Sequence, residues 1–385
     1  MFQGFRSVYS KMKIEEGSYL LIKTVPGLED VSALEVKNLL KNLEEIIIRP
    51  YGVLGRILIR VNAPVFELAQ TLNEKARSIE KVIVLLGMCK VKRTKDGLNE
   101  IYELIKGSKV SSLLTPHETF GIRPSREGKH EYTSLDIGKV GGDAIIDKIQ
   151  ETYGERPAVD LKHPANIVYC DVVGDTCMVG VDTTGDMALH KRGYRVFDHP
   201  AALRPTIAYA MIKIAGVREK EILLDPFCGG GTILIEAAHM YKNLGLFGID
   251  LFAQNIKGAY LNAICAGVSE KINFIVGDAT KLNKIFNVEV DRIVCNPPYG
   301  IRQLRGEKSR EVPKLYDKFL SSASKILADE GVICIVTPKR RAIQISVDKS
   351  KLKILHKREI YHGGLKVYIF VIGKRDGTYR LRTLI

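Results

Sequence analysis

The 385-residue sequence lacks the features that define several classes of protein. No apolar run approaches the roughly 18 residues that a membrane helix requires, so we expect no membrane-spanning segment. The seven cysteines show neither CxxC spacing nor an even count, which favours reduced, mostly buried thiols and a cytoplasmic location. His190 and His199 lack metal-ligand spacing to other histidines or cysteines, so no metal site is expected. The first twelve residues lack the apolar core of a signal peptide, which leaves a short extension or a second start at Met12.

Positive charge, in contrast, is abundant and unevenly placed. The net charge is +14, and residues 301–385 hold 20 Lys and Arg against 8 Asp and Glu. Most of the excess therefore lies near the end of the chain, and a second cluster, KVKRTK, occupies residues 90–95. This concentration predicts a polyanionic partner, nucleic acid in particular, although charged residues also serve simply to solvate a surface.

Length and hydrophobic pattern predict more than one domain. A chain of 385 residues exceeds what one hydrophobic core usually serves. From Glu221 onward, apolar strand-like runs alternate with helical patterns, which predicts a parallel, doubly wound sheet covered on both faces. Gly363 and Gly364 separate the last two apolar runs and indicate an antiparallel hairpin at the sheet edge. The first 190 or so residues mix short strands and helices as small α+β domains do. Glycine and proline cluster near residues 50–64 and suggest a boundary there.

A glycine loop is the first feature that points to chemistry. The segment DPFCGGGT, from Asp225 to Thr232, follows a predicted strand and opens a helix, where a doubly wound sheet places its ligand. It has neither the lysine of a Walker loop nor the G-x-G-x-x-G spacing of a dinucleotide loop. The next two strands end in Asp250 and Asp278. One acid at a strand end is usually a helix cap, but three on successive strands outline a nucleoside site. A tight turn without a ligand is the alternative.

The stretch RIVCNPPY places Asn296, two prolines and Tyr299 at the end of the fourth strand, beside that site. An exocyclic amine on a base is a poor nucleophile because its lone pair is delocalised into the ring. Two acceptors that take both amino hydrogens turn the lone pair towards an electrophilic methyl group. The Asn296 side-chain oxygen and the Pro297 carbonyl are such a pair, and Tyr299 offers a ring on which a flipped base can stack. A structural double-proline turn with a packed tyrosine is the alternative.

In this order, these motifs resemble class I S-adenosylmethionine-dependent amino-methyltransferases over residues 199–385. Upstream, residues 119–145 and 159–185 resemble the RNA-binding THUMP domain. HKRGYR (190–195) followed by LRPTIAYAMI resembles the link between the two domains in THUMP-containing guanosine-N2 methyltransferases. The fold class that this implies is α/β: a Rossmann-like methyltransferase domain with a mostly parallel seven-stranded sheet and a C-terminal antiparallel hairpin, preceded by α+β ferredoxin-like and THUMP domains. The implied domains are 1–62 (ferredoxin-like), 63–187 (THUMP), 188–200 (linker) and 201–385 (methyltransferase).

The resemblance implies a monomeric tRNA-processing enzyme of archaeal type with S-adenosylmethionine as its cofactor and tRNA as its partner. It implies transfer of a methyl group to the N2 amine of a guanosine flipped into the NPPY pocket. Asn296, where related enzymes acting near the D-stem show aspartate, favours the acceptor stem and position 6. Three alternatives stay open: a ribosomal RNA guanine-N2 methyltransferase, an adenine-N6 methyltransferase and a catalytically inactive RNA-binding scaffold.

The resemblance also assigns roles to residues. Asp225 and the loop backbone would embrace the methionine part of the cofactor, Asp250 its ribose, and Asp278 with Ala279 its adenine. The cofactor-binding set is Asp225, Phe227, Cys228, Gly229, Gly231, Thr232, Asp250, Leu251, Asp278 and Ala279, in which the Cys228 thiol is expected to be a small packing group. The catalytic set is Asn296, Pro297 and Tyr299. Candidate RNA contacts, or simply solvated cations, are Lys191, Arg192, Arg195, Arg302, Arg305, Lys308 and Arg310.

Overall fold

The computed structural model describes residues 19–41, 43–199, 202–299 and 311–377. Met12 and the basic segment that holds Arg302, Arg305, Lys308 and Arg310 lie outside these ranges. The chain divides into two compact units. Of the described residues, the first unit contains Tyr19–Thr24 together with Ala33–Leu189, and the second contains Val25–Ser32 together with those from His190 onward.

The first unit is built on one seven-stranded sheet. In sheet order its strands are β2 (Leu43–Ile48), β3 (Arg56–Val61), β1 (Tyr19–Thr24), β4 (Ile79–Lys90), β7 (Thr176–Asp182), β6 (Asn166–Val173) and β5 (Phe120–Glu127). The long strand β4 pairs with β1 through its first half and with β7 through its second half. The parts predicted as ferredoxin-like and THUMP domains therefore share a sheet, and the boundary at residue 62 stays a prediction.

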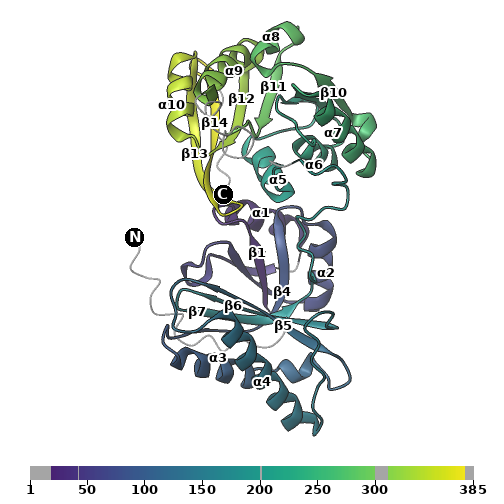
Figure 1. Cartoon of the computed structure of the whole chain (residues 1–385). Coiled ribbons are helices and arrows are strands. Elements are labelled where there is room, and N and C mark those ends of the chain that lie inside the picture. Colours follow the sequence, from purple (N-terminus) through teal and green to yellow (C-terminus); the bar gives the residue numbers. More distant parts are fainter. Residues whose placement is uncertain (1–18, 42, 200–201, 300–310, 378–385) are drawn as a thin grey trace. The chain divides into compact units, whose positions relative to one another are not determined.

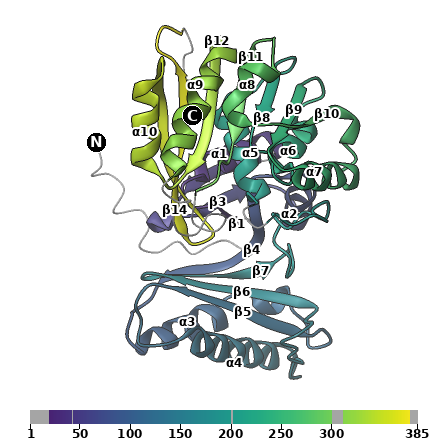
Figure 2. The same ribbon diagram turned by 45° about the horizontal axis from the view of Figure 1, so that its top comes forward.

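The helices of this unit are α1 (Glu29–Leu39), whose first turn belongs to the second unit, α2 (Val65–Lys75), α3 (Asp96–Lys106) and α4 (Ser134–Tyr153). Figure 2 shows α3 and α4 along the sheet half formed by β5, β6 and β7. Thr133 and Asp136 form a capping box at the start of α4, and Gly154, with a φ of 78°, ends it. The glycine and proline cluster at 50–64 forms a short 3₁₀ turn, Pro50–Gly52, between β2 and β3, and then the entry to α2.

The second unit has the predicted doubly wound architecture (Figure 1). In sheet order its strands are β10 (Ile272–Val276), β9 (Gly245–Asp250), β8 (Ile222–Asp225), β11 (Val290–Cys295), β12 (Leu327–Thr337), β14 (Leu365–Lys374) and β13 (Leu352–His362). The first five are parallel, and β14 runs antiparallel to both β12 and β13. Gly363 and Gly364 have φ values of 57° and 77°, as a tight hairpin turn requires. The predicted α/β fold class is thus confirmed.

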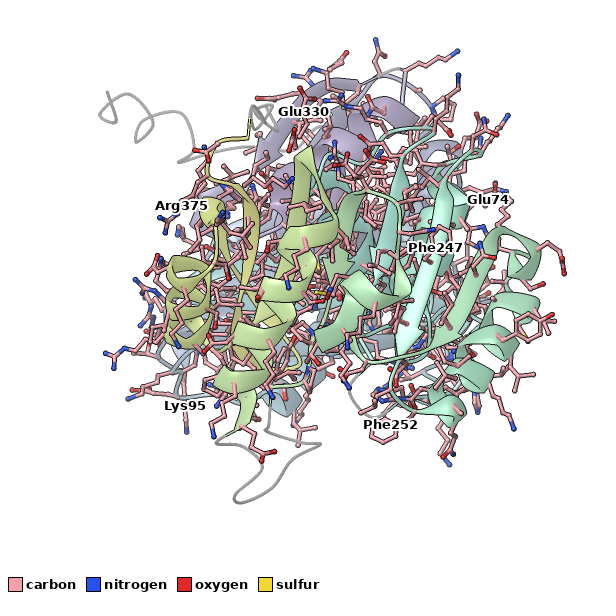
Figure 3. All side chains as sticks on the ribbon, turned by 90° about the horizontal axis from the view of Figure 1, so that it is seen from above. Glu74, Lys95, Phe247, Phe252, Glu330 and Arg375 are labelled. Atoms are coloured by element: carbon pink, nitrogen blue, oxygen red, sulfur yellow. The ribbon has the colours of Figure 1, made fainter. Side chains whose placement is uncertain are left out.

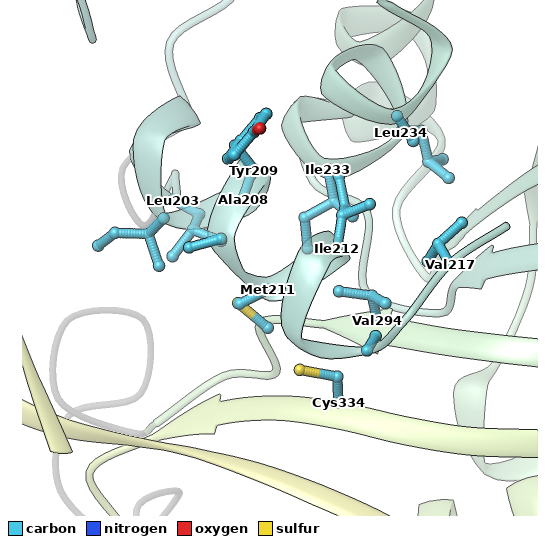
Figure 4. Packing of buried hydrophobic residues seen from close by; sticks show 14 of the residues in the cluster. Leu203, Ala208, Tyr209, Met211, Ile212, Val217, Ile233, Leu234, Val294 and Cys334 are labelled. Atoms are coloured by element: carbon cyan, nitrogen blue, oxygen red, sulfur yellow. The ribbon is translucent and has the colours of Figure 1, made fainter. Parts of the chain in front are cut away.

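Successive residues of a strand point to opposite faces of the sheet, and in the central strands both are apolar. Helices therefore cover both faces of this sheet. On β11, Val294 faces α5 (Pro205–Ile214), α6 (Thr232–Met240) and α7 (Ala253–Cys265). Figure 4 shows Val294 and Cys334 beneath Met211 and Ile212 of α5. The opposite face packs against α8 (Leu282–Ile285), α9 (Val312–Ile326) and α10 (Arg340–Lys349). This pattern of buried strands explains why the sheet could be predicted from sequence.

The second unit also contains a segment that the sequence did not predict to belong to it. Val25, Leu28 and Val31 pack in the same apolar cluster as α5 and α6. Asp30 forms a two-bond ion pair with Arg358 of β13. Within the ranges described, no helix is both long and apolar enough to cross a membrane.

Candidate functional site

The carboxyl ends of β8, β9, β10 and β11 meet at one edge of the second sheet, where a cavity of about 930 Å³ opens. In Figure 3, Phe252, which follows β9 at this edge, lies far from Glu330, which marks the opposite edge. The cavity is lined by every residue of the predicted cofactor-binding set except Gly231, and by all three of the predicted catalytic residues. The structure therefore places these predicted residues around one cavity, and the role of each stays a prediction.

The glycine loop owes its shape to two positive φ angles. Gly229 has a φ of 50°, and Gly231, the residue before α6, has a φ of 77°, a region that side chains with a Cβ atom rarely adopt. A Cβ on Gly231 would also lie 3.2 Å from the Ala259 side chain. The Cys228 amide donates to the Ile249 carbonyl at 2.9 Å and joins the loop to β9. Bare backbone therefore faces the cavity and can approach a ligand closely.

Asp250 is held by several donors at the end of β9. Its Oδ2 accepts from the Gly229 amide at 3.0 Å, and its Oδ1 accepts from the Phe252 amide at 3.0 Å and from the Asn255 side chain at 2.9 Å. These donors fix the orientation of the carboxylate at the cavity wall. Asn255 was not predicted from sequence, although its position five residues after Asp250, in the first turn of α7, is the signal that could have identified it.

Asp225 is the buried acid of the site, with only 2% of the residue exposed. Burial, reinforced by the nearby charge of Asp250, raises its pKa to about 8, against the opposing effect of the Phe227 amide, which donates to Oδ1 at 3.1 Å. A cationic ligand group in the cavity would favour the ionised carboxylate and offset the free-energy cost of burying its negative charge.

Asp278 combines two roles that the sequence presented as alternatives. It lines the cavity, and its Oδ1 also caps the following 3₁₀ turn by accepting from the Thr280 amide at 2.9 Å and hydroxyl at 2.7 Å. Burial acts to raise the pKa of Asp278, but the bonds from Thr280 and the nearby Lys281 outweigh it and leave the pKa below its usual value. Capping thus positions a charged carboxylate beside Ala279 at the cavity wall.

The NPPY turn follows β11 directly. The Tyr299 hydroxyl donates to Asn296 Oδ1 across a short contact. Burial raises the pKa of Tyr299 far above its ordinary value, so this hydroxyl keeps its proton. Behind the turn, the buried Tyr316 hydroxyl lies 3.4 Å from the Pro298 carbonyl oxygen and 2.9 Å from Thr337 Oγ1. The turn is therefore tied to α9 and to the end of β12.

The HKRGYR segment also reaches the cavity. Lys191 and Arg195 line it, and Arg195 pairs with Asp198 at 2.8 Å. Arg192 instead lies 3.8 Å from Glu236, a fully buried residue of α6, which leaves little of its side chain for RNA. Lys191 and Arg195 thus lie at the cavity wall, whereas Arg192 is directed towards the interior.

Other contributors to the site had no clear signal in the sequence. Asn262 of α7 donates to the Gly230 carbonyl at 2.9 Å, so a buried amide supports the glycine loop. His199 lies beside Gly229, and burial lowers its pKa, which favours the neutral ring. His362 and Leu365, which flank the β13–β14 turn, also line the cavity. All of them come from segments distant in sequence, so only the fold brings them here.

Comparisons with known proteins match both parts of the chain. Residues 192–368 match the RMKL-like methyltransferase domain, and residues 95–182 match the THUMP domain. The tRNA (guanine(6)-N2)-methyltransferase of Archaeoglobus fulgidus is 37% identical, over 90% of each chain. Its counterpart in Methanocaldococcus jannaschii is 35% identical, over 90% of this chain and 97% of the relative. The crystal structure of TrmN from Thermus thermophilus superposes with a TM-score of 0.73 at 27% identity and covers 92% of this chain and 99% of that one.

Fold and site thus define a Rossmann-like methyltransferase joined to an RNA-binding module. The chain belongs to the family of THUMP-domain-containing, class I S-adenosylmethionine-dependent tRNA guanosine-N2 methyltransferases. The predicted enzyme class and the predicted cofactor are confirmed by this membership. In the described residues no three His, Cys, Asp or Glu side chains gather as a metal site would require, and the prediction that no metal is used stays a prediction.

Proposed function

We propose that this protein transfers a methyl group from S-adenosylmethionine to the N2 amine of the guanosine at position 6 of a tRNA acceptor stem. The observation that carries the proposal is that the NPPY turn and the acids of three strands line one cavity. The chemistry of that turn suits an exocyclic amine, and two relatives that align over most of the chain carry the name tRNA (guanine(6)-N2)-methyltransferase.

The cavity has the features that the cofactor needs. Its volume, about 930 Å³, lies near the upper end of the range for small-molecule sites and leaves room for a base beside the cofactor. The loop backbone around Gly229 and the carboxylate of Asp225 would hold the methionine part, Asp250 the ribose hydroxyls, and Asp278 with Ala279 the adenine. When bound, S-adenosylmethionine supplies an electrophilic methyl group on a positively charged sulfur.

The residues at the end of β11 would prepare the target base. An amide oxygen has two lone pairs, and Asn296 Oδ1 accepts from the Tyr299 hydroxyl. In the proposed complex the same oxygen would also accept an amino hydrogen of the base. The Pro297 carbonyl would accept the second hydrogen. With both hydrogens held, the nitrogen lone pair points away from the ring plane. The alkylated nitrogen then loses a proton to solvent, so no strong base is required.

The first unit would choose the nucleotide. A flipped base fits the cavity whatever its place in the RNA, so selection requires a module that reads RNA shape at a distance. We assign this task to the THUMP part of the first unit, with the boundaries 1–62, 63–187, 188–200 and 201–385 as the proposed domains. We also propose that the protein acts as a monomer in the cytoplasm.

Inosine provides a direct test, because it differs from guanosine only in lacking the 2-amino group. Two otherwise identical tRNA molecules, one with guanosine and one with inosine at position 6, would be incubated with protein and methyl-labelled cofactor. We expect label only in the guanosine tRNA. A third tRNA with an adenosine–uridine pair at this position tests N6 chemistry. Label in the inosine tRNA at that nucleotide, or transfer to the adenosine, would overturn the proposal.

A further inference from the structure

A second hollow, of about 600 Å³, lies in the same unit between α9 and α10. Pro313 and Asp317 of α9 line one side of it, and Tyr368 of β14 lines its base. The remaining wall is residues 338–342, which follow the carboxyl end of β12 and begin α10, together with Ile345, Ser346 and Lys349 of α10. Figure 1 shows α10 next to α9 on the second unit. The hollow therefore opens near the sheet edge that carries the methyltransferase cavity, but it shares no lining residue with it.

Three consecutive cations form one wall of this hollow: Lys339, Arg340 and Arg341, called here the basic patch. Arg340 and Arg341 are exposed, and Lys339 is half-buried. Over the residues that the structure covers, none of the three pairs with a carboxylate; the nearby Asp317 is engaged by Lys349 at 2.6 Å and by Ser346 at 2.5 Å. The charge of the patch is thus not neutralised by described neighbours.

The position of the patch is unfavourable for the helix itself. The patch occupies the start of α10, whose first turn contains no acidic residue. A helix N-terminus carries a partial positive charge and is stabilised by anions, so cations placed there are unfavourable. Three cations at this end gain nothing for folding. An anion in the hollow would compensate both the side-chain charge and the helix dipole.

A short relay of hydrogen bonds connects the patch to the NPPY turn. The Tyr316 hydroxyl contacts the Pro298 carbonyl on one side and Thr337 Oγ1 on the other. The Lys339 amide in turn donates to Thr337 Oγ1 at 3.0 Å. Two residues, Tyr316 and Thr337, thus separate the turn that would hold the target base from the first cation of the patch. The backbone at the start of the patch is therefore joined to the NPPY turn through these two side chains.

We propose that the basic patch Lys339–Arg341 binds the phosphate backbone of the tRNA within a few nucleotides of the methylated base. The proposal rests on the proposed function and extends it with a phosphate-binding surface on the catalytic unit. The partner is RNA because the hollow presents several adjacent cations with a helix N-terminus, which matches a row of phosphates. Such contacts position the RNA without reading its sequence.

The test compares two full-length variants with equal charge change. The first carries Lys339→Gln, Arg340→Gln and Arg341→Gln. The control carries Lys325→Gln, Lys351→Gln and Lys353→Gln, three exposed lysines near the amino end of β12 and the start of β13. The dissociation constant for an unmodified tRNA transcript is measured at several salt concentrations, and that for S-adenosylmethionine at one.

We expect the patch variant to lose about two to three units of slope in the logarithm of affinity against the logarithm of salt, because each phosphate contact contributes about 0.7 to 0.9. Cofactor affinity should stay within twofold, and the control should lose less than one unit. An unchanged slope in the patch variant, or an equal loss in the control, overturns the proposal. Because binding is measured without turnover, failure of the wild-type protein to methylate tRNA would count against the proposed function alone.

Discussion

The Tyr299 hydroxyl donates a hydrogen bond to the Asn296 side-chain oxygen within the NPPY turn. An amide side chain can rotate to exchange its oxygen and nitrogen, and only the oxygen can accept from a base amine. In the orientation that the structure shows, the protonated Tyr299 hydroxyl donates to the amide oxygen and holds that oxygen in place. Tyr299 is therefore a positioning residue for Asn296, in addition to the stacking role proposed for its ring.

Replacing Tyr299 with phenylalanine keeps the ring and removes only this bond. A neutral hydrogen bond contributes about 0.5 to 1.5 kcal/mol, so we expect the single-turnover rate of methyl transfer to fall about 3- to 10-fold. Cofactor and tRNA affinities should not change. A rate equal to that of the wild type would show that the hydroxyl does not position Asn296, while a large drop in tRNA affinity would place its role in binding.

Replacing Asn296 with alanine removes the acceptor itself. We expect methyl transfer to be lost, with a dissociation constant for S-adenosylmethionine within severalfold of the wild-type value, because the proposed partner of this oxygen is the base. Single-turnover kinetics at saturating cofactor and tRNA measure the first quantity, and calorimetry measures the second. A variant that retained the wild-type rate would rule out the proposed geometry.

Asp250→Ala should show the opposite pattern. Its carboxylate is oriented by the Gly229 amide, the Phe252 amide and Asn255, and it faces the proposed ribose position. We expect cofactor affinity to fall by about two orders of magnitude, as for loss of a hydrogen-bonded charged group. Titration with cofactor should restore much of the rate. If saturating cofactor does not restore it, the ribose assignment is wrong.

Asp225→Asn should make the folded protein more stable and weaken its binding of the cofactor. The pKa of Asp225 is raised to about 8, so the folded state binds this proton more tightly than the unfolded state. The wild-type protein then loses stability as pH rises from the ordinary carboxyl range through 8, and the variant does not. We expect the melting temperature of Asp225→Asn to exceed that of the wild type by a few degrees at pH 8.5 and by less at pH 5.

The raised pKa of Asp225 also predicts how cofactor binding should depend on pH. In the proposed site the ionised carboxylate of Asp225 meets the cationic methionine part of S-adenosylmethionine. Cofactor affinity of the wild type should therefore rise between pH 6 and pH 8 as the carboxyl loses its proton. Asp225→Asn should bind weakly with no such rise. A wild-type affinity that is flat across this range contradicts the assignment.

The strand-end acids and the NPPY turn could be predicted because each directly follows a continuous apolar strand, and parallel strands bring their carboxyl ends to one edge. Asn262, which supports the glycine loop, and His362, which lines the cavity, could not be predicted, because only the packing of distant segments brings them to the site. Asp30 belongs to the second unit, where it pairs with Arg358, more than 300 residues away in sequence, and no local pattern signals such a pair. In the first unit, β4 is long enough to pair with strands of both regions that the sequence pattern had assigned to separate domains.

Identification of the product nucleoside tests the central claim most directly. Purified protein, S-adenosylmethionine and unmodified tRNA would be incubated, and the tRNA would then be digested and its nucleosides and fragments analysed by mass spectrometry. The account predicts N2-methylguanosine, located at position 6 of the acceptor stem. Methylation of an adenosine, or no transfer to tRNA by a protein that binds the cofactor, would contradict it.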